Sequence, residues 1–309
     1  MNFERRASCA FTVIELLVAV AVAVVLAGIL IVVTRSTLDV WQKAQDRSMA
    51  NVQAKVALDL LTRDLQSAIY RESEATMAVD IVASGNLRDH NWRQDFGNVA
   101  KPDEVAIYTP ATDGSGRYLE RSRFGRSGVW LRFLTTNPTS EGGSPAMVGY
   151  QISRRPMAGD IDASAPKSIR YTLSRIYRDG GETFADGYVA SDHDGDLAGA
   201  GIAQALCDNV VDFGIWCYRR NTNGSLTALY PSGAQDRDFR GAGNQFPDVV
   251  DVMLRVLTEG GAAQLEQIEA GLVPRPALYA TDADWWWAVV ETQSRVLSAR
   301  VVIAGRGGS

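Results

Sequence analysis

The stretch FTVIELLVAVAVAVVLAGILIVV, from Phe11 to Val33, decides the architecture of this chain. It holds one charged residue, Glu15. As a helix it would be about 35 Å long at about 1.5 Å per residue, and about 20 apolar residues suffice to cross a bilayer. Because Arg5 and Arg6 precede it, the positive-inside rule predicts a cytoplasmic N-terminus, with the chain after Arg35 outside the cytoplasm. The sequence therefore predicts one membrane-spanning helix.

A cleaved secretory signal peptide or a simple signal anchor is the alternative interpretation of this segment. A cleaved signal has an apolar region of about 7 to 15 residues and a small-x-small site after it. Here the apolar run is longer, and the small residues 7–10 stand before it. The order favours a helix that stays in the membrane.

Glu15 is the candidate functional residue of the segment. A carboxylate inside a membrane-spanning helix costs at least about 2.5 kcal/mol on insertion scales, so its presence calls for a partner that offsets the cost. An incidental acid near the membrane interface is the alternative.

The residues around Glu15 carry a resemblance to a known family. AFTVIELLV, from Ala10 to Val18, resembles the class III signal of type IV pilins and type II secretion pseudopilins. The resemblance implies that a prepilin peptidase removes residues 1–10 by cutting between Ala10 and Phe11, and methylates the new amine. It also implies that Glu15 pairs with the amine of Phe11, in its own chain or in an adjacent subunit, during assembly. Ala10 departs from the family, which usually has Gly before the cut.

The helical pattern continues beyond the membrane segment, over residues 34–74. No glycine occurs between Gly28 and Gly85, and the first proline is Pro102. Apolar residues at three-to-four-residue spacing predict one apolar face. They are Val52, Val56, Leu60, Leu61, Leu65 and Ile69. The residues expected on the solvated face are Lys55, Asp59, Arg63, Asp64 and Gln66. One helix from about Phe11 to about Tyr70 would be near 90 Å long, and a sheet is expected to cover its apolar face.

Residues 75–309 are expected to form an α+β domain outside the membrane. β-branched and aromatic runs bounded by turn residues predict strands. The expected strands are 104–109, 129–135, 148–154, 169–177, 210–219, 249–258 and 296–303. Helical patterns are expected at 262–270 and from Asp282 onward. The expected loops are 85–102, 110–128, 138–145 and 185–205. Alternating apolar and polar residues predict an antiparallel sheet with one face on a core, packed on the long helix.

The order of the expected strands in the C-terminal part of the chain carries a second resemblance. Residues 209–216, 246–255 and a final strand ending near Ile303 are similar to the C-terminal half of J-type minor pseudopilins. Among these, the chain is most similar to the pilin-like C protein of the Verru_Chthon cassette family. This resemblance implies a pilin-like fold.

Composition and motifs argue against two classes of function. The chain has 309 residues, 46% of them hydrophobic, and a formal net charge of -5 without a Lys/Arg block, which makes it a poor candidate for binding nucleic acid. It has 2 histidines and neither a Gly-x-Ser-x-Gly nor a His-Glu-x-x-His motif, so we expect no enzyme.

Cys207 and Cys217 are the cysteines of the processed chain, because Cys9 lies in the leader. In a periplasmic domain two thiols could form a disulfide. The alternative is that both are small buried apolar residues. On one extended strand they could not meet, because ten residues span roughly 33 Å.

The run Asp192-His193-Asp194-Gly195-Asp196 has the oxygen ligands and glycine of the front part of a calcium loop. Asp192, Asp194 and Asp196 are its candidate ligands. The acid expected six to seven residues after the glycine is missing, because Gly201 and Ile202 stand there. A solvated acidic loop is the alternative. No other cofactor is expected.

Trp285, Trp286 and Trp287 are consecutive in a helical pattern. Three consecutive helical positions point in three directions, so we expect at least one tryptophan at an edge or a contact surface. A subunit contact is the functional interpretation, and packing on the long helix is the alternative.

Together these observations predict a minor pilin-like subunit. It would be processed by prepilin peptidase in the cytoplasmic membrane and join related subunits, at the tip of a type IV pilus-like or type II secretion filament, with its body in the periplasm. The alternative is a single-span membrane-anchored module whose loops bind a carbohydrate or protein ligand.

Overall fold

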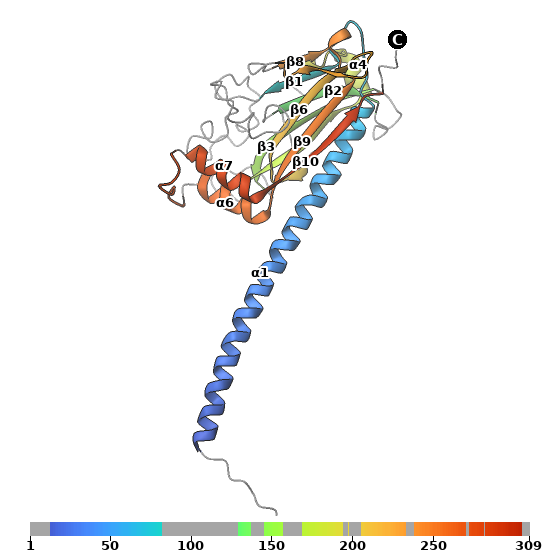
Figure 1. The fold of residues 1–309 in the computed structure, drawn as a ribbon. Coiled ribbons are helices and arrows are strands. Elements are labelled where there is room, and N and C mark those ends of the chain that lie inside the picture. The colour runs from blue at the N-terminus through green and yellow to red at the C-terminus, as the bar shows by residue number, and fades with distance from the viewer. Residues whose placement is uncertain are drawn as a thin grey trace, which may run out of the picture. The chain divides into compact units, whose positions relative to one another are not determined.

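A computed structural model describes residues 13–81, 129–136, 145–156, 169–193, 197, 205–232, 238–269, 272–280 and 282–304. The chain forms two compact units, residues 1–46 and residues 47–309. It combines one long N-terminal helix with two antiparallel sheets (Figure 1), which confirms the predicted α+β class. The expected strand at 104–109 lies outside the described residues.

The N-terminal helix, α1, runs without interruption over Val13–Gln66. In the first unit, every residue from Val13 to Gln42 is exposed, although most of them up to Val33 are apolar. Within the described chain, α1 is the helix that is long and apolar enough to cross a membrane. The leader and Phe11 lie outside the described residues.

The helix ends at Gln66, before the predicted end near Tyr70, because the chain turns to pair with a strand. The last turn tightens as the Ala68 amide donates to the Leu65 carbonyl at 3.1 Å. Ala68 then forms an isolated β-bridge with Thr135, and the Ile69 amide donates to the Leu134 carbonyl at 2.9 Å. Residues 67–74 are therefore not helical.

The body contains a six-stranded and a four-stranded sheet, with all neighbouring strands antiparallel. In spatial order the first comprises β5 (Ala205–Asp208), β4 (Ile169–Arg178), β3 (Ala146–Pro156), β2 (Val129–Thr135), β1 (Met77–Ile81) and β8 (Asp238–Gly241). The second comprises β10 (Ser294–Val302), β9 (Val249–Leu257), β6 (Val210–Arg220) and β7 (Leu226–Tyr230). Six predicted strands are confirmed, whereas β1, β5, β7 and β8 were not predicted.

One residue joins the two sheets. Asn209 separates β5 from β6 and has a φ of 62°. Asparagine tolerates this left-handed conformation better than most residues, so the chain can leave one sheet and enter the other without a loop. A single apolar core then includes residues of both sheets and of the body part of α1.

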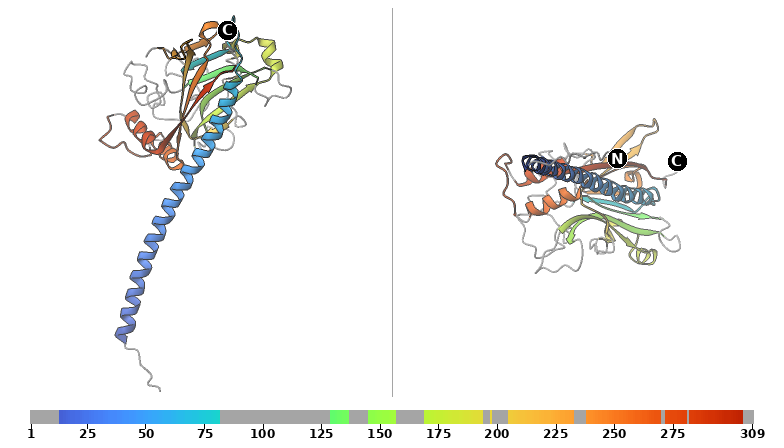
Figure 2. Two further views of the ribbon diagram at one scale, coloured as in Figure 1. Left: turned by 45° about the vertical axis from the view of Figure 1, so that its right-hand side comes forward. Right: turned by 90° about the horizontal axis from the view of Figure 1, so that it is seen from below.

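Short helices lie at both ends of the body (Figures 1 and 2). They are α4 (Gly180–Asp186), η1 (Ala190–His193), η3 (Gly243–Gln245), α6 (Glu259–Glu269) and α7 (Asp282–Gln293). Helices α6 and α7 contact each other and confirm the two predicted helical patterns. The expected loop 185–205 is not wholly irregular, because η1 lies within it.

Candidate functional site

Glu15 lies in the first turn of α1. Its neighbours Ile14 and Leu16 are 76% and 62% exposed, so the acid lies among exposed apolar side chains. An acidic side chain at this end of a helix interacts favourably with the helix dipole. Ala10 and Phe11 lie outside the described residues, so peptidase cleavage and the pairing of Glu15 with the Phe11 amine stay predictions.

The body part of α1 buries only part of the predicted apolar face. Leu61 and Leu65 are fully buried as predicted, together with Ala54 and Ala57, whereas Val52 and Val56 are 61% and 58% exposed. Alanine carries the smallest apolar side chain, so it lets the helix axis approach the core closely. The buried face therefore includes two alanines, Ala54 and Ala57, that the predicted apolar pattern did not contain.

The exposed apolar residues of α1 also form a stripe. Met49, Val52 and Val56 lie within about 60° of one another at about 100° per residue. All three are at least 58% exposed. We call them the outer stripe. In the body, the outer stripe lies roughly opposite the buried face.

A buried acid fixes α1 to the six-stranded sheet. Asp64 is fully buried, and Arg175 on β4 donates to its two carboxylate oxygens from Nε at 2.7 Å and from Nη2 at 3.3 Å. The Tyr150 hydroxyl on β3 also donates to this carboxylate, and the Thr135 hydroxyl donates to the Asp64 carbonyl at 2.9 Å. We call Asp64, Tyr150 and Arg175 the helix lock.

The helix lock is electrostatically consistent. Burial, together with the Asp64 carboxylate, raises the pKa of Tyr150 well above its usual value, so the phenol stays protonated and donates. Burial works against the charge of Arg175, but its hydrogen bonds to Asp64 raise the pKa of the guanidinium. The lock therefore joins one anion, one cation and one neutral donor at physiological pH.

Asp64 was expected on the solvated face, which is wrong. Its position carries the correct signal, because residue 64 lies three after Leu61 and seven after Ala57, on the buried arc of the helix. Asp64 was left out of the predicted buried face only because its side chain is charged. Which cation would neutralise it could not be read from the sequence, because Arg175 is 111 residues away.

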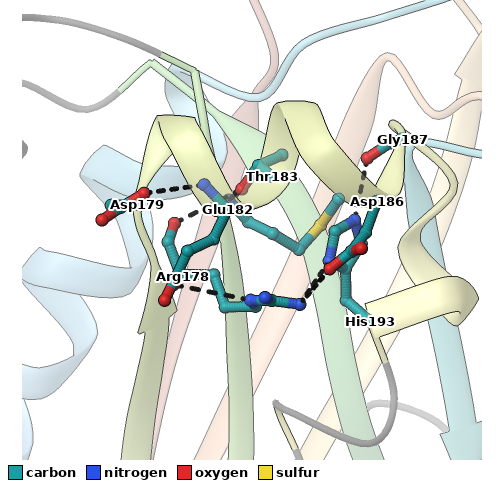
Figure 3. Close-up of polar contacts among 8 residues, drawn as sticks. Arg178, Asp179, Glu182, Thr183, Asp186, Gly187 and His193 are labelled. Atoms are coloured by element: carbon teal, nitrogen blue, oxygen red, sulfur yellow. Dashed lines mark hydrogen bonds and ion pairs between the residues drawn. The ribbon is translucent and has the colours of Figure 1, made fainter.

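The candidate calcium loop begins beside a polar cluster around Arg178 and His193 (Figure 3). Fully buried His193 donates from Nε2 to the Gly187 carbonyl at 2.8 Å, so its Nδ1 is left as an acceptor, 3.4 Å from Nη1 of Arg178. Arg178 also donates to Asp186 at 2.8 Å, and Asp179 caps α4 through the Glu182 amide. These contacts hold α4 and η1 together.

Asp192 itself is exposed on η1, while Asp194 and Asp196 lie outside the described residues. Within the described part of the chain, no three His, Cys, Asp or Glu side chains gather in a metal-binding group. Calcium binding by the three aspartates stays a prediction.

The expectation that one tryptophan of α7 lies at an edge is wrong. Trp285, Trp286 and Trp287 are all buried, and Trp286 contacts both Trp287 and Tyr171 edge to face. The geometric argument assumed one core on one side of the helix. Helix α7 instead packs against α6 as well as β10, so several of its faces are covered and these residues offer no subunit contact surface.

Cys207 on β5 and Cys217 on β6 are free, buried thiols in different sheets. Burial and the neighbouring Asp208 carboxylate raise the pKa of Cys207 to about 12, and burial raises the pKa of Cys217. Both behave as small core residues, the second of the two interpretations.

Comparisons of the chain with models of protein families, with curated proteins and with solved structures find no match. The candidate site consists of a helix with a membrane-length apolar segment, an acid in its first turn, and an outer stripe on the body part of the helix, roughly opposite its buried face.

Proposed function

We propose that this chain is a minor pilin-like subunit that is anchored in the cytoplasmic membrane by α1 and assembles with related subunits through that helix. The observation that carries the proposal is that the body part of α1 has two apolar faces. One is buried in its own domain, and the outer stripe remains exposed. A solvated helix with one domain to support needs only one apolar face, so the second favours a protein partner.

Three features support the proposal beside the outer stripe. The residues from Ala10 to Val18 resemble a prepilin signal. Glu15 lies in the first turn of the apolar helix, where a carboxylate in lipid is costly, which favours a pairing with the amine of Phe11 when subunits join. The helix lock joins the body part of α1 to the six-stranded sheet, which fixes the face that this part of the helix leaves exposed.

In this proposal prepilin peptidase cuts before Phe11, the N-terminus starts in the cytoplasm, and the body is periplasmic. The partners are other pilin-like subunits, and the chain is neither an enzyme nor a nucleic-acid binder. A body of this size suits the tip of a type IV pilus-like or type II secretion filament, because shaft subunits repeat at close spacing.

Mass spectrometry of the mature N-terminus tests the processing step. N-methylated Phe11 is expected, whereas an intact leader would favour the membrane-anchored ligand-binding module. A cut after the apolar run would remove the anchor and contradict both interpretations. For assembly, Glu15→Ala is expected to be processed normally but to be lost from complexes with partner subunits in a pull-down. Glu15→Asp is the control, since it keeps the carboxylate. Wild-type recovery of Glu15→Ala would remove the role of this acid.

A further inference from the structure

The turn between β6 and β7, residues 221–225, contains an asparagine followed by a glycine, Asn223-Gly224. Residues 222–225 are all exposed, so water reaches both members of the pair. Gly224 has a φ of 81°, a left-handed conformation that favours glycine. Apart from its chain neighbours, no described atom lies within 4 Å of the point that a Cβ of residue 224 would occupy. The backbone nitrogen of Gly224 is therefore not shielded by any side chain of its own residue.

The side-chain carbonyl of Asn223 accepts two hydrogen bonds within the turn. Ser225 donates to its Oδ1 from the backbone amide at 3.0 Å and from the hydroxyl at 2.7 Å. The Ser225 hydroxyl in turn accepts from Nδ2 of Asn221 at 2.8 Å, which makes it a stronger donor. When a nucleophile attacks Cγ of Asn223, negative charge develops on Oδ1, and the two donors stabilise it as an oxyanion hole does. The turn therefore activates Cγ toward attack.

The nucleophile that the chain itself supplies is the backbone nitrogen of Gly224. Because this nitrogen directly follows Asn223, its attack on Cγ closes a five-membered ring, and an intramolecular reaction of this kind avoids the entropy cost of bringing two molecules together. The Gly224 amide donates to the Asn221 carbonyl at 2.9 Å. This hydrogen bond opposes loss of the amide proton, so the reaction is slow and depends on base.

We propose that Asn223 is a modification site at which the chain converts itself to aspartate and isoaspartate. Base removes the amide proton of Gly224, and the nitrogen forms a bond to Cγ of Asn223. The bond between Cγ and Nδ2 breaks, and Nδ2 leaves as ammonia after taking up one proton, which leaves a cyclic imide. Water then opens the imide at Cγ to give aspartate, or at the main-chain carbonyl carbon to give isoaspartate. The conversion needs no co-reactant but water, and it does not depend on the proposed function.

The two products have different consequences for β7. Aspartate keeps a side-chain oxygen for the two donors of Ser225 and adds one negative charge, so the turn persists. Isoaspartate lengthens the main chain of the turn by one carbon, between the register partners Arg220 and Leu226. The register of a hairpin is fixed by its turn, and β7 is an edge strand that pairs with β6. Isoaspartate at residue 223 therefore loosens β7, whereas aspartate does not.

Incubation of the full chain in detergent at 37 °C, at pH 7.5 and at pH 8.5, tests the proposal. Peptide mapping by mass spectrometry detects the exchange of the side-chain amide for a carboxylate, and an isoaspartyl methyltransferase labels the isoaspartate. Both products are expected at residue 223, several-fold faster at the higher pH because the nucleophile is the deprotonated amide. Asn244 is the control within the chain, since it is also exposed but is followed by Gln245, and it should stay unchanged.

Three variants separate the contributions of the turn. Ser225→Ala removes the hydroxyl donor and should slow the conversion several-fold in the full chain, but not in an unfolded peptide of residues 219–227. Asn223→Gln should lose the conversion, because the larger ring closes far more slowly. Asn223→Asp carries the aspartate product from the start. Hydrogen exchange of residues 226–230 should be faster in the isoaspartate fraction than in Asn223→Asp, which should match the fresh wild-type chain.

Each contrary outcome overturns part or all of the proposal. If the peptide converts while the full chain keeps Asn223 intact, the turn protects the asparagine and residue 223 is no modification site. If Ser225→Ala converts as fast as the wild-type chain, the two donors to Oδ1 do not activate Cγ. If Asn244 converts as fast as Asn223, exposure alone decides the rate and the geometry of the turn has no role.

Discussion

Replacing Asp64 by alanine is expected to destabilise the body strongly. Asp64 is fully buried, and its removal leaves the Arg175 guanidinium, 15% exposed, and the Tyr150 hydroxyl without their carboxylate. Breaking a buried ion pair by removing one partner costs about 3 to 5 kcal/mol. Because the total free energy of unfolding of a domain is about 5 to 15 kcal/mol, this loss is a large fraction of it.

Urea unfolding of the full chain in detergent, followed by tryptophan fluorescence, measures the effect. With a denaturant slope of about 3 kcal/mol per molar, the midpoint should fall by roughly 1 M or more. Asp59→Ala is the control on the same helix, because Asp59 is exposed; surface changes of this kind usually stay within about 0.5 kcal/mol. Equal midpoints for the two alanine variants would refute the reasoning.

A second variant separates the charge from the packing. Replacing all three lock residues by apolar ones of similar size, Asp64→Leu, Tyr150→Phe and Arg175→Met, removes the desolvation cost together with the attraction. Such replacements are often neutral or stabilising. The triple variant should therefore recover most of the stability lost in Asp64→Ala. Failure to recover would mean that shape at the lock, rather than an unpaired buried charge, dominates the loss.

Three further predictions concern other parts of the chain. Val52→Ser/Val56→Ser on the outer stripe should leave the unfolding midpoint of the isolated chain nearly unchanged and abolish cross-linking to partner subunits, whereas Leu61→Ala on the buried face should cost about 2 to 5 kcal/mol. Since the pKa of Tyr150 is raised in the folded state, its contribution to stability is complete below about pH 10 and is lost as the pH rises toward the folded value; Tyr150→Phe should flatten this alkaline decline in unfolding experiments between pH 9 and 11. The Cys207 thiol should react with a maleimide at pH 8 only after addition of denaturant, and rapid labelling of the native chain would contradict its burial.

The sequence predicted the long strands because each is a continuous β-branched or aromatic run. The short strand β1 was not predicted, because Asp80 interrupts the apolar run in its sequence, MAVDI. In the sheet this charge is met from both sides, by Arg132 on β2 and by Arg240 on β8 at 3.1 Å. Burial opposes the ionisation of Asp80, but the two guanidinium groups lower its pKa overall. A charge that looks incompatible with a strand is thus stabilised by residues 52 and 160 positions away, which no local pattern contains.

In the candidate site, too, the features that depend on local sequence could be predicted, and those that depend on long-range packing could not. The membrane segment, Glu15 and the long helix follow from composition and helical periodicity, which are local properties. The face that α1 buries depends on the shape of the sheets that it packs on. Ala54, Ala57 and Asp64 are therefore buried, and the expected Val52 and Val56 are exposed. The burial of Trp285, Trp286 and Trp287 likewise depends on how α6 and β10 surround α7, and a helical wheel drawn for one segment cannot supply that information.

The helix lock and the outer stripe are connected by helix geometry. Advancing the buried face by one residue would rotate α1 by about 100° and carry Asp64 away from Arg175 and Tyr150. That rotation would leave a buried cation unpaired, at a cost of several kcal/mol, whereas alanine and leucine packing alone distinguishes neighbouring rotations weakly. The lock thereby sets which residues of α1 face away from the body, and these are Met49, Val52 and Val56. An ion pair that adds little net stability can in this way determine the surface through which the proposed assembly takes place.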